Sequence, residues 1–265
     1  MSETETGQTF WDHLDELRSA LIRIICASLL CGVVAFFFKE LLFKILLAPT
    51  SSDFITYTLI NKVGSTTGVS IEPFSIDLIN TALASQFLIH MRAAFIAGAI
   101  CASPYILYCL MRFIAPALYS SERKTVFTVI TCGYVMFALG MLLCYFVIFP
   151  MTFHFLGTYQ VSDQVENLIS LESYISTFLR LTLLMGIVFE LPMVCWLVAK
   201  LGFIEAATMR QYRRHAIVVI LILAAIITPT SDVFTLMLVG VPMWLLYEVS
   251  IIVVSRTNKT SLSND

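Results

Sequence analysis

The sequence predicts an all-α, polytopic membrane protein with six transmembrane helices. Its 265 residues are 58% hydrophobic and only 13% charged, whereas a soluble domain carries about a quarter charged residues. The mean hydropathy is +0.88, and several apolar runs are long enough to cross a hydrocarbon core of about 30 Å. We therefore expect a single integral membrane domain over residues 1–265, with a surface that mostly faces lipid.

Six apolar runs are the candidate spans. The fifth run is short, because as a helix it would extend only about 21 Å. The sixth is interrupted by Glu248 after about fifteen residues, so we expect the fifth and sixth helices both to be short. The predicted spans cover residues 19–38, 93–111, 125–149, 174–197, 215–228 and 233–255.

The distribution of lysine and arginine predicts the orientation. With six spans, both termini share one side with two connecting loops. Most cations lie on that side, and they are Arg18, Arg23, Arg112, Arg123, Lys124, Lys200, Arg210, Arg213, Arg214, Arg256 and Lys259. The positive-inside rule then places both termini in the cytoplasm. The outer loops are expected at about residues 39–92 and 150–173, with an interfacial helix over 74–89.

Glu190 is the most unusual residue, because it lies in the middle of the fourth apolar run. An ionisable group at that depth costs a few kcal/mol, so it normally faces a protein interior or a wet cavity. Pro192, two residues later, removes a backbone donor and leaves a carbonyl to be satisfied. Two interpretations stay open for Glu190: a polar site that faces the protein interior or a wet cavity, or a hydrogen-bonded residue that only holds helices together.

Two further acids flank the sixth apolar run. Asp232 precedes the run and is expected to cap its helix. Glu248 lies toward the inner side, where Arg210, Arg213 and Arg214 are its candidate partners.

An amphipathic turn is predicted before the first span. Thr9 has the character of a helix cap, and the following turn should lie in the membrane interface. Asp12 and Glu16, four residues apart, then point toward the cytosol. A solvated face in which these acids pair with Arg18 and Arg23 explains this stretch when it is taken alone.

The residues give no sign of catalysis or of a bound cofactor. The sequence has no phosphate-binding glycine loop, no Gly-x-Ser-x-Gly elbow and no histidine pair with metal-ligand spacing. The 7 cysteines lie in or beside apolar runs, where packing explains them. We therefore expect neither an enzyme nor a metal site, and we expect no nucleic-acid partner.

Five motifs occur in order along the spans, and in them the chain resembles the TatC family of the twin-arginine protein translocase. They are His13-Leu14-x-Glu16-Leu17-Arg18, Pro104 with Phe113-x-x-Pro116-x-Leu118-x-x-x-Glu122, Phe189-Glu190-x-Pro192, Thr228-Pro229-x-x-Asp232-x-Phe234 and Pro242-Met243-x-x-x-Tyr247-Glu248. The resemblance implies a concave bundle in the bacterial cytoplasmic (inner) membrane. It also implies a receptor for twin-arginine signal peptides that exports folded proteins with the proton-motive force. The implied partners are TatA- and TatB-like single-span subunits and further copies of the chain.

The resemblance also assigns roles to residues. Glu16 and Glu122 would bind the signal arginines, because guanidinium forks match carboxylates in a way that lysine does not. Phe113 and Leu118 would receive apolar side chains beside them, although anchoring of the loop in the interface is an equal explanation. Arg18 is also assigned to the signal-peptide-binding residues. Structural or partner contacts are assigned to Pro104, Pro116, Pro192, Asp232 and Glu248.

Two other classes of function were weighed against the receptor. A proton-coupled small-molecule carrier would use Glu190 as the acid that carries the proton. Such carriers often contain internal repeats with paired broken helices, but this sequence has no second Glu-x-Pro in a matching position. An intramembrane hydrolase would need a nucleophile and a base. The type of ligand separates the first two classes: an arginine-pair peptide for the receptor, and a solute with protons for the carrier.

Overall fold

The structure is a computed structural model that describes residues 10–67, 77–114, 123–160, 162, 167–228 and 232–261. The main helices are α1 (Phe10–Phe37), α4 (Ser85–Ile114), α5 (Arg123–Leu143), α7 (Leu171–Phe189), α8 (Leu191–Lys200), α10 (Arg213–Ile227) and α11 (Val233–Ser261). The shorter elements are α2 (Lys39–Leu47), η1 (Ala48–Thr50), α3 (Ile55–Thr67), β1 (Leu78–Ile79), η3 (Cys144–Ile148), α6 (Phe149–Thr158), β2 (Ile169–Ser170) and α9 (Ala206–Gln211). The all-α membrane fold predicted from the sequence is confirmed.

Within the described residues, five helical segments are long and apolar enough to cross a membrane. They are Leu14–Phe37, Ser85–Phe113, Val129–Thr158, Leu171–Lys200 and Val233–Arg256. The fifth predicted span corresponds to α10, whose 15 residues extend only about 22 Å. The protein is therefore a multi-pass membrane protein with one short helix packed among longer ones.

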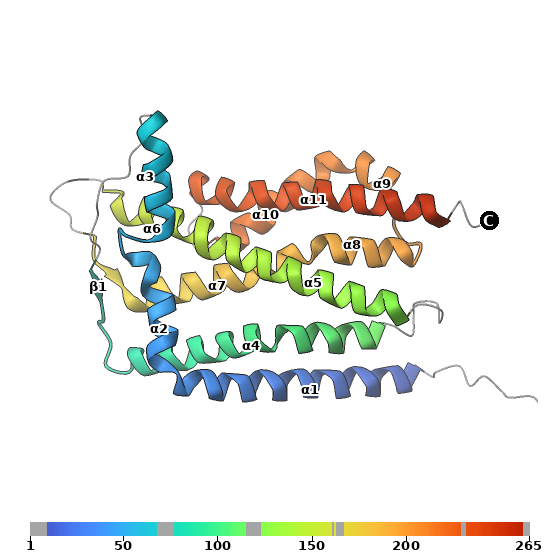
Figure 1. Cartoon of the computed structure of the whole chain (residues 1–265), viewed down its shortest axis with the longest axis horizontal. Helices are drawn as coiled ribbons and strands as arrows, with labels where there is room; N and C mark the ends of the chain where they lie inside the picture. The colour runs from blue at the N-terminus through green and yellow to red at the C-terminus, as the bar shows by residue number, and fades with distance from the viewer. Residues whose placement is uncertain are drawn as a thin grey trace, which may run out of the picture.

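The helices form a bundle with two distinct ends (Figure 1). At one end α1 begins and α4, α8 and α11 end, and we call this the terminal end. At the other, α2 and α3 run across the bundle beside the short strands, and we call this the cap end. Helix α1 lies at one edge and packs mainly on α4, whereas the buried core lies among α4, η3, α7, α10 and α11.

The sixth helix is longer than the sequence led us to expect. Helix α11 has 29 residues and continues past Glu248 and through Pro242. The prediction of a short sixth helix was therefore wrong, because a charged residue ends an apolar run without breaking the backbone ladder. The Glu248 carboxylate is accommodated by the Arg213 guanidinium of α10, 2.6 Å away.

The cap end differs from the predicted outer loop. Residues 39–67 are mostly helical, and the expected interfacial helix over 74–89 is absent from the described residues 77–89. Instead Leu78 and Ile79 form β1, and α4 begins at Ser85, well before residue 93. The Ser85 hydroxyl donates to the carbonyl of Ala82 (3.0 Å) and to the side-chain oxygen of Asn80, which starts the helix at this point.

The third predicted span also runs further than expected, because the chain stays helical from α5 through η3 and α6 to Thr158. Pro150 has no N–H to bond the carbonyl of Phe146, four residues earlier. The Thr56 hydroxyl of α3 donates to that carbonyl, and the Tyr57 hydroxyl donates to the carbonyl of Pro150 at 2.9 Å. The Thr56 hydroxyl of α3 therefore satisfies the carbonyl that Pro150 leaves open, and Tyr57 adds a second contact between α3 and the same segment.

Three more contacts join the two segments of the cap end. Strands β1 and β2 pair in parallel, with Leu78 opposite Ile169. The Tyr174 hydroxyl of α7 donates to the carbonyl of Leu46 at 2.9 Å. Arg92 and Glu172 form an exposed ion pair at 3.3 Å. The described parts of residues 39–92 and 150–174 thus pack together as one unit over the spans.

Candidate functional site

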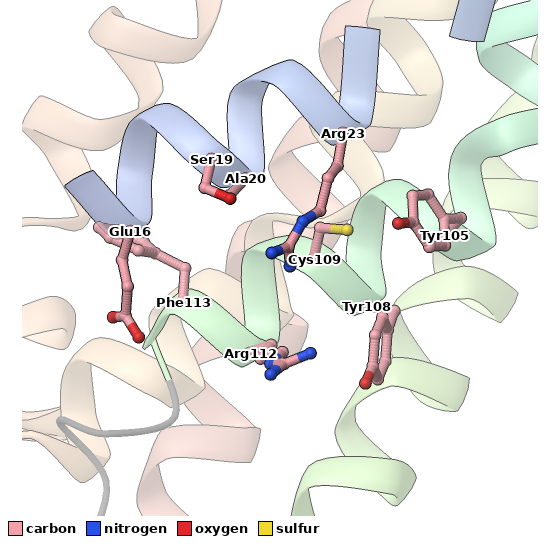
Figure 2. A pocket seen from close by; sticks show the side chains of 9 residues that line it. All are labelled: Glu16, Ser19, Ala20, Arg23, Tyr105, Tyr108, Cys109, Arg112 and Phe113. Atoms are coloured by element: carbon pink, nitrogen blue, oxygen red, sulfur yellow. The ribbon is translucent and has the colours of Figure 1, made fainter. Parts of the chain in front are cut away.

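A pocket opens between α1 and α4 near the terminal end of the bundle. Its volume is about 130 Å³, and Figure 2 shows the side chains around it. It is lined by Glu16, Ser19, Ala20 and Arg23 from α1 and by Tyr105, Tyr108, Cys109, Arg112 and Phe113 from α4. Both groups follow the spacing of one helix face, so two helix faces build the pocket.

Glu16 lies at one end of this pocket, and its side chain is exposed. It makes no ion pair with any residue in the described part of the chain, so the expected pairing with Arg18 or Arg23 does not form. Residues two apart on a helix face different directions, and Arg23 lies about 10 Å further along the helix axis. The Glu16 carboxylate therefore remains available to a ligand.

Phe113 lies on the last turn of α4, is half-buried, and lines the pocket beside Glu16. The structure therefore brings these two predicted site residues together. Arg18 is exposed and does not line the pocket. The predicted residues Pro116, Leu118 and Glu122 fall outside the described residues, as do the side chains of Phe10, Asp12 and His13.

Four α4 residues of the pocket wall were not predicted as site residues from the sequence. Counted from Tyr105, they follow at three, four and seven residues, a spacing that places all four on one face of a helix: Tyr105, Tyr108, Cys109 and Arg112. That spacing was visible, but only the packing of α1 on α4 shows which face meets Glu16. The result is a pocket with a carboxylate at one end and two guanidinium groups, of Arg23 and Arg112, toward the other (Figure 2).

Glu190 forms the second polar feature, at the single-residue junction between α7 and α8. Its backbone N–H donates to Ile187 (3.0 Å), and its carbonyl accepts from Val194 (2.9 Å), so the helix resumes at once. Pro192 sits in the first turn of α8, where a proline is well tolerated. The side-chain Oε1 is buried and has no hydrogen-bond partner among the described residues, which disfavours the interpretation of Glu190 as a hydrogen-bonded packing residue.

The glycine at position 133 of α5 makes room for this carboxylate. A Cβ atom added to Gly133 would lie 3.1 Å from Oε2 of Glu190, tighter than most contacts of real Cβ atoms. The Glu190 side chain therefore points at the α5 backbone across the α5–α7 interface. Glu190 is half-buried, and burying its Oε1 without a partner costs free energy. Such costs usually persist where the group has a function.

The remaining predicted residues have structural contacts. Asp232 accepts a 2.7 Å hydrogen bond from the backbone N–H of Thr235, the geometry of a helix N-cap. Glu248 pairs with Arg213, one of its three expected partners. Pro104 lies inside α4 with its side chain exposed.

Comparisons with known proteins identify the relatives of the chain. Residues 12–242 match the family model described as Sec-independent protein translocase protein (TatC). A relative of that name from Blattabacterium sp. subsp. Periplaneta americana is 35% identical over 257 residues, covering 95% of this chain and 96% of its own length. One from Aquifex aeolicus is 36% identical over 241 residues, covering 91% and 92%.

The fold has solved counterparts. A crystal structure of the twin-arginine translocase receptor TatC superposes with a TM-score of 0.73 at 34% identity, covering 91% of this chain and 97% of that one. A second, of the receptor TatC in the detergent DDM, gives a TM-score of 0.74 at 33% identity.

Proposed function

The chain belongs to the TatC family, a component of the twin-arginine translocase, and on this premise we propose that it is the receptor for twin-arginine signal peptides. The observation that carries the proposal is the open carboxylate of Glu16 at the mouth of the α1–α4 pocket, next to Phe113. An arginine side chain reaching that carboxylate can form two parallel hydrogen bonds, which lysine cannot. The aromatic ring beside it offers an apolar contact for the residue that follows.

We assign the second signal arginine to Glu122 through its motif. Glu122 follows Phe113 by nine residues and directly precedes the first residue of α5. The end of α4 and the start of α5 both lie at the terminal end, where α1, the helix that carries Glu16, begins. The proposal therefore gives the two arginines two acids on the same side of the membrane, with Leu118 as a further apolar contact.

The terminal end faces the cytoplasm in this proposal, and the membrane is the bacterial inner membrane. The excess of lysine and arginine at the chain ends and at the two connecting loops supports this orientation. Residues 1–265 then act as a single membrane domain that assembles with TatA- and TatB-like single-span subunits and with further copies of itself. Export of folded cargo is driven by the proton-motive force, and no catalytic step is assigned to the chain.

Glu190 serves as a polar docking or transport site inside the bundle in this proposal. Its unpartnered Oε1 supports this role over a purely cohesive one. Membership of a protein-translocase family favours the receptor over the proton-coupled small-molecule carrier, which would use the same residue.

The test is peptide binding by the purified protein in nanodiscs. A twin-arginine signal peptide and its twin-lysine counterpart are titrated against wild type, Glu16→Gln and Glu122→Gln. Glu205→Gln is the matched control, because Glu205 is an exposed acid before α9, outside the pocket. We expect the wild type to prefer arginine by roughly tenfold for each contact. Each of the variants Glu16→Gln and Glu122→Gln should lose the part of that preference that its own contact supplies, and the control should lose none. Equal binding of the two peptides by wild type would reject the receptor proposal.

A further inference from the structure

The α1–α4 pocket contains two cations that none of the five sequence motifs includes. Arg23 extends from α1 toward α4, and Arg112 extends from the last turns of α4 into the same region (Figure 2). Both side chains are exposed, and neither makes an ion pair with another residue of the described part of the chain. In Figure 2 Glu16 lies to one side of the two guanidinium groups and Tyr105 and Tyr108 to the other, and no labelled carboxylate stands between the two guanidinium groups.

Two tyrosines place these cations at the level of the membrane interface. Tyr105 and Tyr108 line the same pocket and are 43% and 45% exposed. Tyrosine concentrates where the hydrocarbon meets the headgroups, because its ring is apolar and its hydroxyl needs water or a polar partner. Arginine and tyrosine donors therefore converge between two helices that are each long enough to span the membrane, in the part of each helix nearer the terminal end.

We propose that this end of the pocket binds the phosphodiester of an anionic phospholipid from the leaflet that the terminal end faces. A phosphodiester offers acceptor oxygens that match two guanidinium forks, and tyrosine hydroxyls can donate to the same group. Basic pockets between transmembrane helices on the cytoplasmic side are suited to such headgroups. A lipid is favoured over a soluble phosphate because lipid chains can lie along the exposed apolar faces of α1 and α4. The site goes beyond the proposed receptor function, since it needs no signal peptide.

The first experiment counts the lipids that stay bound. Protein is extracted from nanodiscs containing phosphatidylglycerol and phosphatidylcholine, and retained lipid is counted by native mass spectrometry. The variants are Arg23→Gln, Arg112→Gln and the double variant. Arg214→Gln is the control, because Arg214 is an exposed arginine of α10 that does not line the pocket. We expect phosphatidylglycerol retention about tenfold weaker in the double variant, since hydrogen bonds to charged groups are the stronger ones, and unchanged in the control.

Two measurements on the wild type keep the test decisive if the double variant does not fold. A photoreactive phosphatidylglycerol should crosslink to the facing segments of α1 and α4. Soluble glycerol 3-phosphate, added to protein in pure phosphatidylcholine, should bind far more weakly than the lipid. Any one of three results would overturn the lipid site. They are equal lipid retention by wild type and a folded double variant, crosslinks confined to helices other than α1 and α4, and binding of glycerol 3-phosphate as tight as that of the lipid. None of these readouts uses a signal peptide, so their failure leaves the receptor proposal standing.

Discussion

Replacing Gly98 with alanine should push α1 away from α4. The added Cβ would lie 2.3 Å from the backbone nitrogen of Gly32 and 2.8 Å from the backbone oxygen of Ser28, where ordinary contacts begin at 3.4 Å. Both obstacles are backbone atoms, so no side chain can rotate away, and the helices must separate by about 1 Å at the crossing. Because α1 packs mainly on α4, this movement reaches the pocket between them.

The expected cost follows from overpacking. Extra atoms in a close-packed site typically cost about 1–3 kcal/mol, whereas a glycine to alanine change in a helix gains up to about 1 kcal/mol of propensity. Gly240→Ala is the control that carries the same gain, because its Cβ would meet only the side chains of Leu221 and Ala224, at 3.7 and 3.9 Å. The difference between the two variants therefore isolates the overpacking cost.

The assay is the free energy of unfolding in mixed micelles, followed by signal-peptide affinity in nanodiscs. We expect Gly98→Ala to be less stable than Gly240→Ala by about 1–3 kcal/mol and to bind peptide more weakly, while Gly240→Ala behaves as wild type or better. Equal stability of the two variants would show that α1 and α4 do not cross as closely as described.

Three further outcomes test other parts of the structure. Thr56→Val removes the donor to the Phe146 carbonyl and should lower the free energy of unfolding by about 1–3 kcal/mol. The control Thr58→Val should lower it little, because the Thr58 side chain is exposed and its hydroxyl bonds within its own helix. If Thr58→Val were the more destabilising of the two, the role given to α3 would be contradicted. Glu248→Gln and Arg213→Gln break a half-exposed ion pair, so each should cost only about 0.5 kcal/mol, and the double variant should cost no more than either alone. Glu190→Leu removes a buried oxygen without a partner, so it should raise the free energy of unfolding by about 1 kcal/mol while export of cargo falls. A lower free energy of unfolding with export retained would instead make Glu190 a packing residue.

The sequence predicts most of the membrane architecture because residues that face lipid must be apolar, so the spans appear directly as hydropathic runs. Glu190 stands out for the same reason, since a carboxyl group is conspicuous in an apolar run. Helix ends are recorded less directly. Glu248 interrupts the apolar run but not α11, because the partner that accommodates it, Arg213, comes from another helix.

The composition of the α1–α4 pocket required the structure. Arg112 and Tyr108 follow an ordinary helical spacing, and only the packing of one helix on the other brings them near Glu16. The cap end required it too. The break at Pro150 is tolerated because Thr56, 90 residues away along the chain from Phe146, supplies the missing donor, and such a long-range contact leaves no periodic signal in the sequence.

The central claim is that Glu16 contacts a signal arginine, and a double-mutant cycle measures that contact directly. Each arginine of the signal peptide is replaced by lysine in turn, and affinity is measured for wild type and for Glu16→Gln. We expect one of the two replacements to weaken binding to wild type by roughly tenfold and to have little further effect on Glu16→Gln, because the contact is already lost. If both replacements weaken binding to the two proteins by the same factor, Glu16 does not contact either arginine, and the assignment of the pocket is wrong.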